Sequence, residues 1–227
     1  MNIAFIPVRA GSKSIPLKNI KNLNGKPLVY WTTKAANDAN CIDKVIVATD
    51  SVEIKSIVES FGLEKVSIYN RKAENATDTA STESVMLEYI NQSDLSMDDN
   101  FFLIQATSPM LKSEHIDGMF KYFTQSGADS IFSCVVEKQF HWRFVGQNGL
   151  VEPVNYDYKN RPRRQEFEGL VAENGACYIN SVGNVLRYKC RLSGKITYYE
   201  LPSYTAYEID EESDWIVVEE LMKKWIK

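Results

Sequence analysis

Apolar runs separated by polar turns divide the first 136 residues into alternating strands and helices. Segment 2–8 is apolar almost throughout, as expected for a strand that is buried on both faces of a sheet. The same pattern predicts further strands at 44–49, 65–69, 100–105 and 130–136, and helices at 27–37, 52–61, 78–90 and 113–125. Strands that alternate with helices predict an α/β fold with a mostly parallel sheet and right-handed crossovers.

Three helix starts carry recognisable local signals. Pro27 suits the first turn of its helix, since a proline lacks the N–H that is unpaired there. Thr77 or Asp78 is predicted to cap the helix at 78–90, and Ser113 to cap the helix that follows it.

The pattern changes after Glu137. Segment 137–175 is rich in aromatic and basic residues and short turns, which favours a hairpin-containing excursion over another helical crossover. A return strand at 176–180, a strand at 195–201 and a closing helix at 213–226 are predicted after it. We therefore expect one α/β domain, residues 1–136 plus 176–227, with a small inserted subdomain at 137–175.

Three polar loops are expected to meet at one edge of the sheet. They follow Val8, Thr49 and Gln105, each at the carboxyl end of a predicted strand. Ligands of open α/β sheets bind beyond the carboxyl ends of the strands. These loops are therefore predicted to form one site.

The loop after the first strand has the character of a phosphate-binding loop. Residues 9–26 contain five basic residues and no acidic one. Gly11 and Ser12 allow a tight turn that directs N–H groups at an anion, and Arg9, Lys13 and Lys18 could surround a triphosphate. A solvated basic loop is the alternative, but the position after a buried strand favours a ligand. The loop matches neither the Walker pattern nor G-x-G-x-x-G, which argues against a P-loop ATPase and a dinucleotide dehydrogenase.

Composition narrows the class of protein further. The net charge of -4 argues against a general nucleic-acid binder, and no apolar run is long enough to cross a bilayer. The N-terminal residues do not form a signal peptide, and four widely spaced cysteines favour free thiols in a reducing cytoplasm. His115 and His141 are the only histidines, and neither lies near a cysteine at zinc-ligand spacing. We expect a soluble, cytoplasmic protein.

A set of short motifs adds a resemblance to these observations. In this order and spacing, the chain resembles the bacterial CMP-sialic acid synthetase (acylneuraminate cytidylyltransferase) family along nearly its whole length. The matching pieces are Ile6–Lys13, Lys18–Ile20, Asn24–Leu28, Ala48–Asp50, Arg71, Asp78–Ser81, Leu103–Pro109, Arg163–Gln165, Glu173–Ala176 and Glu208–Asp210.

The resemblance implies a Rossmann-like, three-layer nucleotidyltransferase fold, a homodimer formed through segment 137–175, and an excursion that reaches over the partner's site. The implied reaction transfers CMP from CTP to the anomeric hydroxyl of a nine-carbon 2-keto sugar acid, such as sialic acid or its deaminated form, and releases pyrophosphate. Mg²⁺, or Mn²⁺ in its place, would assist. Transfer to Kdo, pseudaminic or legionaminic acid remains open, as does a non-catalytic, nucleotide-sensing relative; the Arg163–Gln165 run favours the nine-carbon sugar.

The resemblance also implies roles for individual residues. Arg9, Ser12, Lys13 and Lys18 would hold the CTP phosphates, and backbone groups near Ala10 and Gly11 would contact the nucleotide. The nucleotide would also contact Arg71 and Ser81, with Asp78 ordering that loop. The sugar acid would contact Gln105, Arg143, Arg163 and Gln165. The metal carboxylates would be Asp210 and Glu208, with Asp210 as the more direct ligand.

Two of these assignments have simpler alternatives. Glu208 and Asp210 precede a predicted helix, where acidic side chains are favoured by the helix dipole alone. The basic cluster at 159–164 could be a solvated face of the subdomain. Some relatives carry Asp in place of Glu208 and some carry Arg in place of Ala172, and Arg143 stands where relatives have Lys.

Overall fold

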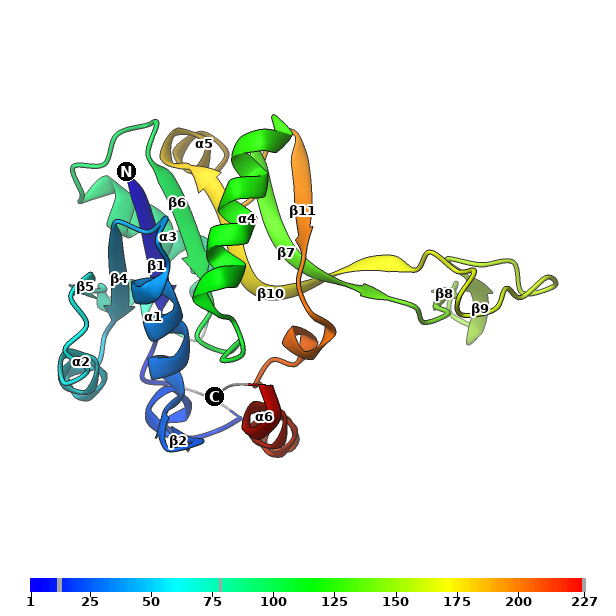
Figure 1. The fold of residues 1–227 in the computed structure, drawn as a ribbon, viewed down its shortest axis with the longest axis horizontal. Helices are drawn as coiled ribbons and strands as arrows, with labels where there is room; N and C mark the ends of the chain where they lie inside the picture. Colours follow the sequence, from blue (N-terminus) through cyan, green and yellow to red (C-terminus); the bar gives the residue numbers. More distant parts are fainter. Residues whose placement is uncertain (12–13, 78, 226–227) are drawn as a thin grey trace.

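A seven-stranded sheet forms the centre of the molecule in the computed structural model, which describes residues 1–11, 14–77 and 79–225 (Figure 1). The strand order is β11-β7-β10-β6-β1-β4-β5. The strands are β1 (Asn2–Pro7), β4 (Lys44–Thr49), β5 (Val66–Asn70), β6 (Asn100–Ile104), β7 (Ser130–Glu137), β10 (Leu170–Ser181) and β11 (Ile196–Glu200). Only β10 runs antiparallel to its neighbours among the described strands of this sheet, which confirms the prediction of a mostly parallel sheet.

Helices cover both faces of the sheet. They are α1 (Leu28–Asp38), α2 (Val52–Glu59), α3 (Thr82–Asn91), α4 (Ser113–Ser126), α5 (Val182–Tyr188) and α6 (Glu212–Trp225). Short 3₁₀ helices lie at Lys18–Ile20, Ala73–Asn75 and Ser203–Ala206 (η1, η2 and η3), and small hairpins pair β2 (Asn22–Leu23) with β3 (Lys26–Pro27) and β8 (Trp142–Val145) with β9 (Leu150–Pro153). No helix within the described ranges has the length and apolar character needed to cross a membrane.

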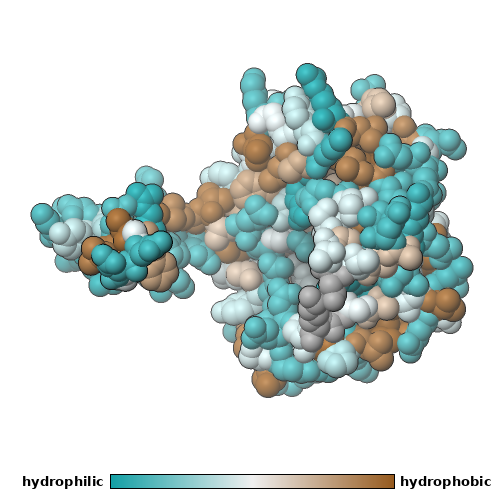
Figure 2. Space-filling view, turned by 180° about the vertical axis from the view of Figure 1, so that it is seen from behind, coloured by the Kyte–Doolittle hydropathy of each residue, from teal (hydrophilic) through white to brown (hydrophobic). Residues whose placement is uncertain are grey.

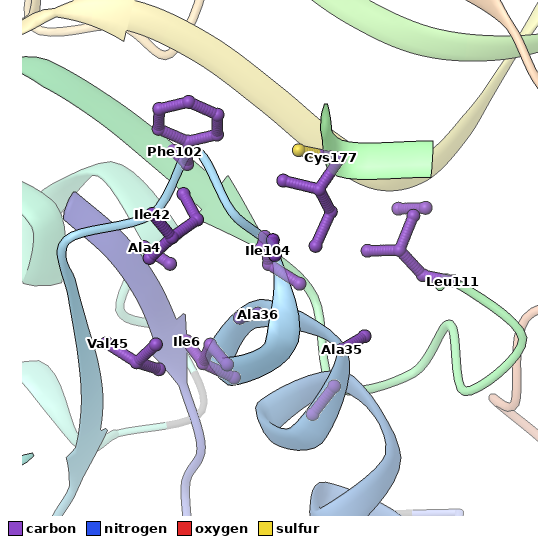
Figure 3. Close-up of a cluster of buried hydrophobic side chains, with 14 of the residues drawn as sticks. Ala4, Ile6, Ala35, Ala36, Ile42, Val45, Phe102, Ile104, Leu111 and Cys177 are labelled. Carbon is purple, nitrogen blue, oxygen red and sulfur yellow. The ribbon is translucent and has the colours of Figure 1, made fainter. Parts of the chain in front are cut away.

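The apolar runs of the central strands supply two cores at once. Ala4 and Ile6 of β1 pack with α1, α2 and α4 on one face of the sheet, where Figure 3 shows part of the cluster. Ile3 and Phe5 of the same strand pack with α3 and α5 on the other face. Successive side chains of a strand point to opposite faces, so a strand that is covered on both sides must be apolar at every position. Burial of each large side chain stabilises the fold by roughly 1.5–3 kcal/mol.

A third apolar cluster joins the N-terminal loop to the closing helix. Ile15 and Leu23 of the loop region pack with Ile209, Trp215 and Val218, all of them buried. Lys21 strengthens this contact, since its ammonium group lies 4.5 Å from the Trp215 ring centroid and pairs with Glu212 at 2.9 Å. The loop and the start of α6 are therefore held together although they are far apart in the sequence.

Two of the predicted helix caps were wrong. Helix α3 begins at Thr82, and Ser81 caps it by accepting the Ser84 N–H at 3.1 Å, whereas Thr77 lies outside the helix. The other candidate cap, Asp78, lies outside the described residues. Ser113 is the first residue of α4 and Lys112 occupies the cap position. The predicted Pro27 helix start is confirmed to within one residue, since Pro27 directly precedes Leu28.

Segment 138–169, here called the arm, stands clear of the rest of the molecule (Figure 1). Strands β7 and β10 pair as far as Glu137 and Leu170 at its base, so the return strand begins at Leu170 rather than at the predicted Ala176. The arm contains the predicted hairpin, β8–β9. Its small aromatic cluster centres on Phe140, whose ring centroid lies 4.3 Å from that of Tyr156 and 5.0 Å from that of Phe167.

Candidate active site

A pocket of about 300 Å³ opens at the carboxyl ends of β1 and β6. The loops after β1, β5 and β6 and the first turn of α3 line it, as expected for a ligand site in an open α/β sheet. The lining residues are Pro7, Arg9, Gly11, Lys18, Asn19, Arg71, Ala80, Ser81, Thr82, Val85, Gln105, Ala106 and Thr107. The structure therefore brings together six of the predicted ligand-binding residues: Arg9, Gly11, Lys18, Arg71, Ser81 and Gln105.

The phosphate loop is shaped by two polar residues that had no predicted role. Asn19 is buried and donates from its side-chain amide to the Arg9 carbonyl at 3.0 Å. Asp50, at the end of β4, accepts the Ala10 N–H at 3.1 Å. Both bonds fix the Arg9–Ala10 peptide group at the start of the loop, and the side chains of Arg9 and Lys18 line the pocket. Ser12 and Lys13, both predicted phosphate ligands, lie outside the described residues.

Arg71 is a buried cation at the wall of the pocket. Only 9% of the residue is exposed, and its guanidinium donates to the Asn75 carbonyl. Burial lowers the pKa of Arg71, and the carboxylates of Asp50 and Glu88 oppose that change. Its Nε atom has no hydrogen-bond partner within residues 1–11, 14–77 and 79–225. An unpaired buried donor is costly, so a polar or anionic ligand in this pocket would relieve the cost.

Glu88 organises the loop that carries Arg71. Its carboxylate accepts bonds from the Tyr69 hydroxyl at 2.7 Å, the Lys72 N–H at 2.8 Å and the Asn75 side-chain amide. Burial acts to raise the pKa of Glu88, but hydrogen bonds from Asn75 and Tyr69 outweigh it and lower the pKa. Nothing in the sequence distinguishes Glu88 from an ordinary helical glutamate, because its partners are identified only by the fold.

The first turn of α3 adds a positive end of a helix dipole to the same pocket. Ser81, Thr82 and Val85 line the cavity, and the unpaired N–H groups of a helix start attract anions. The Ser81 hydroxyl already serves as the helix cap. Its role as the cap therefore places Ser81 at the pocket, and the predicted contact of Ser81 with a nucleotide stays a prediction.

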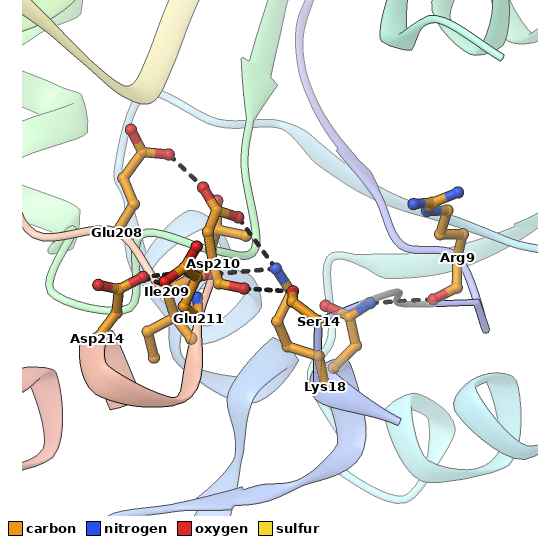
Figure 4. A network of polar contacts seen from close by, with 10 residues as sticks. Arg9, Ser14, Lys18, Glu208, Ile209, Asp210, Glu211 and Asp214 are labelled. Atoms are coloured by element: carbon orange, nitrogen blue, oxygen red, sulfur yellow. Dashed lines mark hydrogen bonds and ion pairs between the residues drawn. The ribbon is translucent and has the colours of Figure 1, made fainter. Parts of the chain in front are cut away.

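Asp210 is joined to the phosphate loop from the other end of the chain. Lys18 donates to the Ile209 carbonyl at 2.9 Å and pairs with the Asp210 carboxylate at 3.1 Å, while the Ser14 hydroxyl donates to the Asp210 carbonyl (Figure 4). The Asp214 carboxylate accepts the Asp210 N–H at 2.9 Å, which caps the turn into α6. The Asp210 side chain itself remains 71% exposed. A carboxylate held by its backbone and open to solvent can accept a cation.

Glu208 lies deeper than Asp210. Its carboxylate is 3.5 Å from the Thr107 hydroxyl, and Thr107 lines the pocket. Burial raises the pKa of Glu208, and the neighbouring negative charge of Asp210 raises it further. The described residues contain no group of three or more His, Cys, Asp or Glu side chains that could hold a metal. A pair of neighbouring carboxylates nevertheless suits Mg²⁺, which takes few protein ligands and completes its shell with water or phosphate.

The arm residues predicted to bind the sugar acid do not line this pocket. Arg143, on β8, pairs with Glu152 across the hairpin, with Nε 2.5 Å from the carboxylate oxygen. Arg163 and Gln165 are exposed on the arm. A separate depression of about 460 Å³ lies on the arm itself, lined by Lys138, Gln139, Phe140, Arg161, Pro162 and Arg164. The predicted binding residues therefore fall into two separate groups.

The chain is similar to known cytidylyltransferases. The sequence matches the cytidylyltransferase family over residues 3–170. It is 38% identical to an N-acylneuraminate cytidylyltransferase of Oncorhynchus mykiss over 96% of this chain and 49% of that protein, and 31% identical to one of Streptococcus agalactiae serotype V over 95% and 52%. The chain thus spans about half the length of these relatives.

Solved structures support the fold. A CMP:2-keto-3-deoxy-manno-octonic acid synthetase in complex with CTP superposes with a TM-score of 0.68 at 18% identity, covering 98% of both chains. A 4-diphosphocytidyl-2C-methyl-D-erythritol synthase from Anaerococcus prevotii gives a TM-score of 0.71 at 11% identity, covering 98% of this chain and 96% of that one. At such identities the likeness concerns the nucleotidyltransferase fold alone. Since the family match covers most of the sequence, the chain belongs to the cytidylyltransferase family.

Proposed function

We propose that the protein transfers CMP from CTP to the anomeric hydroxyl of a nine-carbon 2-keto sugar acid of the sialic acid type and releases pyrophosphate. The observation that carries the proposal is the meeting of Arg9, Lys18 and buried Arg71 at one pocket, beside an acidic pair formed by Glu208 and Asp210. The names of the relatives, all N-acylneuraminate cytidylyltransferases, support the choice of sugar.

In the proposed reaction, the chain's own residues position CTP and neutralise its charge. Arg9 and Lys18 would hold the phosphates, and the N–H groups at the start of α3 and the guanidinium of Arg71 would hold the rest of the nucleotide. The anomeric hydroxyl then attacks the α-phosphate, the bond to the β-phosphate oxygen breaks, and pyrophosphate leaves. Most catalysis of phosphoryl-type transfer comes from such positioning and charge neutralisation.

A divalent cation fits the acidic pair. The pKa of Glu208 is raised by burial and by the Asp210 carboxylate, and the positive charge of a bound cation would offset both effects. Asp210 would be the more direct ligand, with Glu208 beside it or acting through water. Mg²⁺, or Mn²⁺ in its place, would supply charge neutralisation at the phosphates and would favour ionisation of the attacking hydroxyl. Lys18 is paired with Asp210 in this structure. A cation bound to Asp210 would replace this partner, and Lys18 would then be free to turn to the phosphates.

A second copy of the chain would complete the sugar-acid half of the site. Arg143, Arg163 and Gln165 lie on the arm, which stands away from its own pocket (Figure 1). In a homodimer, each arm would reach over the partner's pocket and bring these side chains to the sugar carboxylate and hydroxyls. The arm also exposes apolar residues that a partner would cover, as Figure 2 shows from the opposite side. These include Phe144, Val145, Leu150, Val151, Val154 and Tyr158.

We expect the reaction to take place in the cytoplasm. All four cysteines, Cys41, Cys134, Cys177 and Cys190, are free thiols, and Cys134 and Cys177 are buried in the core. Reduced cysteines are the rule in a reducing compartment, which supports this expectation.

The experiment that tests the function is an assay of pyrophosphate release from CTP with a panel of keto sugar acids. We expect sialic acid or its deaminated form to give the highest kcat/KM. Faster turnover with an eight-carbon acid such as Kdo, or with pseudaminic or legionaminic acid, would reassign the substrate but keep the reaction. Binding of CTP without pyrophosphate release from any acid would favour a nucleotide-sensing protein and contradict the proposal.

A further inference from the structure

Strand β10 contains an irregular turn directly beside the acidic pair. Glu173 pairs with Cys134 of β7, and the next register pair is Tyr178 with Phe132. Between these pairs, β10 advances by 178 − 173 = 5 residues while β7 advances by 134 − 132 = 2. The surplus forms a bulge at residues 174–177. Bulges of this kind re-aim side chains and are common next to active sites.

A buried polar network fixes the shape of the bulge. Asn174 is 3% exposed, and its side-chain oxygen accepts the Ser133 hydroxyl at 2.6 Å. The same Ser133 hydroxyl oxygen accepts the Cys177 N–H at 2.9 Å. Because each of these groups is buried, loss of one partner would leave an unpaired polar atom in the core.

The network also reaches the segment that carries the acidic pair. The Asn174 amide donates to the Thr205 hydroxyl at 3.1 Å and to the Thr205 carbonyl at 3.3 Å. Thr205 is buried in η3, three residues before Glu208. The Ile209 N–H then donates to the Thr107 carbonyl at 2.9 Å. The bulge, η3 and the loop after β6 thus hold both sides of the Glu208 backbone.

Gly175 makes direct room for the Glu208 carboxylate. A Cβ atom at position 175 would lie 2.8 Å from each of the two carboxylate oxygens of Glu208, closer than real contacts allow. The residue also has φ +68, a conformation that side chains other than glycine rarely adopt. Glycine is therefore favoured here by the backbone, and a Cβ atom at this position would force the Glu208 carboxylate to move from its place.

We propose that Asn174 and Gly175 are positioning residues, which hold the Glu208 carboxylate at the edge of the pocket where it can serve a cation. Asn174 acts through the backbone of η3, and Gly175 acts by leaving space for the side chain. The inference rests on the proposed function, because the cation role of Glu208 belongs to it.

A pair of glycine variants separates positioning from backbone strain. Gly175→Ala introduces both an alanine at positive φ and the clash with Glu208. Gly62→Ala is the matched control, because Gly62 has φ +63 and a Cβ atom at that position would meet nothing within 4 Å. Gly175→Ala should lose at least as much thermal stability as Gly62→Ala, because it adds the contact with Glu208 to the backbone strain. We expect Gly175→Ala alone to weaken Mn²⁺ binding to the protein–CTP complex about tenfold, a change of about 1.4 kcal/mol, measured as free Mn²⁺ by electron paramagnetic resonance.

Two further variants test the contact itself. Glu208→Asp, one methylene shorter, should bind Mn²⁺ more weakly in the wild-type background. It should lose much less in the Gly175→Ala background, because the shorter side chain relieves the clash with the methyl group at position 175. Thr205→Val removes the hydroxyl that Asn174 contacts while it keeps the side-chain shape, and it should also weaken Mn²⁺ binding with little change in metal-free CTP affinity.

The outcomes distinguish this inference from the proposed function. Unchanged Mn²⁺ affinity in Gly175→Ala, with weakened affinity in Glu208→Gln, would overturn the positioning role and leave the acidic pair intact. Unchanged Mn²⁺ affinity in Glu208→Gln would mean that Glu208 does not hold the cation. That result would overturn both the proposed cation role of Glu208 and the positioning role of Asn174 and Gly175. Simple additivity of Gly175→Ala and Glu208→Asp would likewise contradict a direct contact, since independent sites add. CTP-dependent turnover of the wild-type protein is measured separately.

Discussion

The pocket and the arm hold the predicted binding residues in opposite physical states. In the pocket, Arg71 is buried and Lys18 is tied to Ile209 and Asp210, so each side chain has a defined place before any ligand binds. On the arm, Arg163 and Gln165 are exposed, and Arg143 is paired with its hairpin neighbour. The residues proposed to hold the nucleotide are therefore organised within one chain, whereas the arm residues proposed to bind the sugar acid are not.

The difference follows from the amount of buried apolar surface in each region. The loops that line the pocket follow strands that are covered by helices on both faces, so the ends of these loops are held in place. The arm has one small aromatic cluster around Phe140 and leaves Phe144 83% exposed and Leu150 64% exposed. A segment with so little buried surface would gain order from contact with the proposed partner. CTP binding should therefore depend on the single chain, and sugar-acid binding on the assembly.

The largest expected effect lies at the acidic pair. Asp210→Asn keeps the backbone contacts of residue 210 but removes the charge that would hold the cation, so turnover should fall roughly 100-fold or more, comparable to the loss of one electrostatic catalytic contact. Steady-state kinetics over an Mg²⁺ titration would measure it. Glu211→Gln, an exposed neighbour, is the control and should be near normal. Near-normal activity of Asp210→Asn would mean that Glu208 and Asp210 only interact favourably with the N-terminal end of α6 and do not hold the cation.

Assembly through the arm should give the next largest effect. Phe144→Asp places a charge on an apolar side chain that is 83% exposed in the single chain, and burial of that charge in a dimer would weaken association about 30-fold, or about 2 kcal/mol. Light scattering across a concentration series measures the change. Ile216→Asp on α6, where the side chain is 67% exposed, is the matched control. If the Phe144→Asp variant dimerises as strongly as the wild type, this face of the arm is not the dimer interface.

A crossed pair of arginine variants tests the separation of the two groups. Arg71→Lys and Arg163→Lys each keep the charge and lose the planar guanidinium, so the affected ligand should bind about tenfold more weakly. Arg71→Lys should raise KM for CTP, and Arg163→Lys should raise KM for the sugar acid. Initial-rate kinetics with each substrate varied in turn would measure both KM values. Equal changes in both constants would mean that the groups are not separate.

The smallest effect concerns stability at Glu208. Because burial raises its pKa, the folded protein binds the Glu208 proton more tightly than the unfolded chain does, so this group costs stability as pH rises through its folded pKa. Glu208→Gln should therefore raise Tm slightly at pH 7 while it lowers activity. The gain should shrink as the pH falls toward the ordinary carboxyl pKa. Thermal unfolding of both proteins between pH 4 and pH 7, roughly the range in which carboxyl groups titrate, would measure it; a gain that grows at low pH would contradict the assignment.

Local patterns predicted most of the sheet and the edge where the pocket forms. The apolar runs predicted β1, β4 and β6 nearly residue for residue, because doubly buried strands leave an unmistakable signal. They missed α5, a seven-residue helix that lies between strands without a long amphipathic pattern. They also misplaced the start of α3, since Thr77 offers the same local chemistry as Ser81.

The sequence by itself determined which residue types meet at the carboxyl edge of the sheet. The basic loop after a buried first strand predicted Arg9 and Lys18 at a ligand site, because ligands bind beyond the carboxyl ends of the strands. The family resemblance added Arg71 and Gln105, and all four residues line one pocket.

Only the tertiary structure decided how those residues are held. Glu88 is joined to Tyr69, 19 positions away, and Asn174 to Thr205, 31 positions away. Lys18 meets Asp210 across 192 positions. Such contacts leave no periodic signal, because each depends on the geometry of the whole sheet rather than on neighbouring residues. The arm's distance from its own pocket has the same origin, since it is set by how far β7 and β10 extend beyond the core.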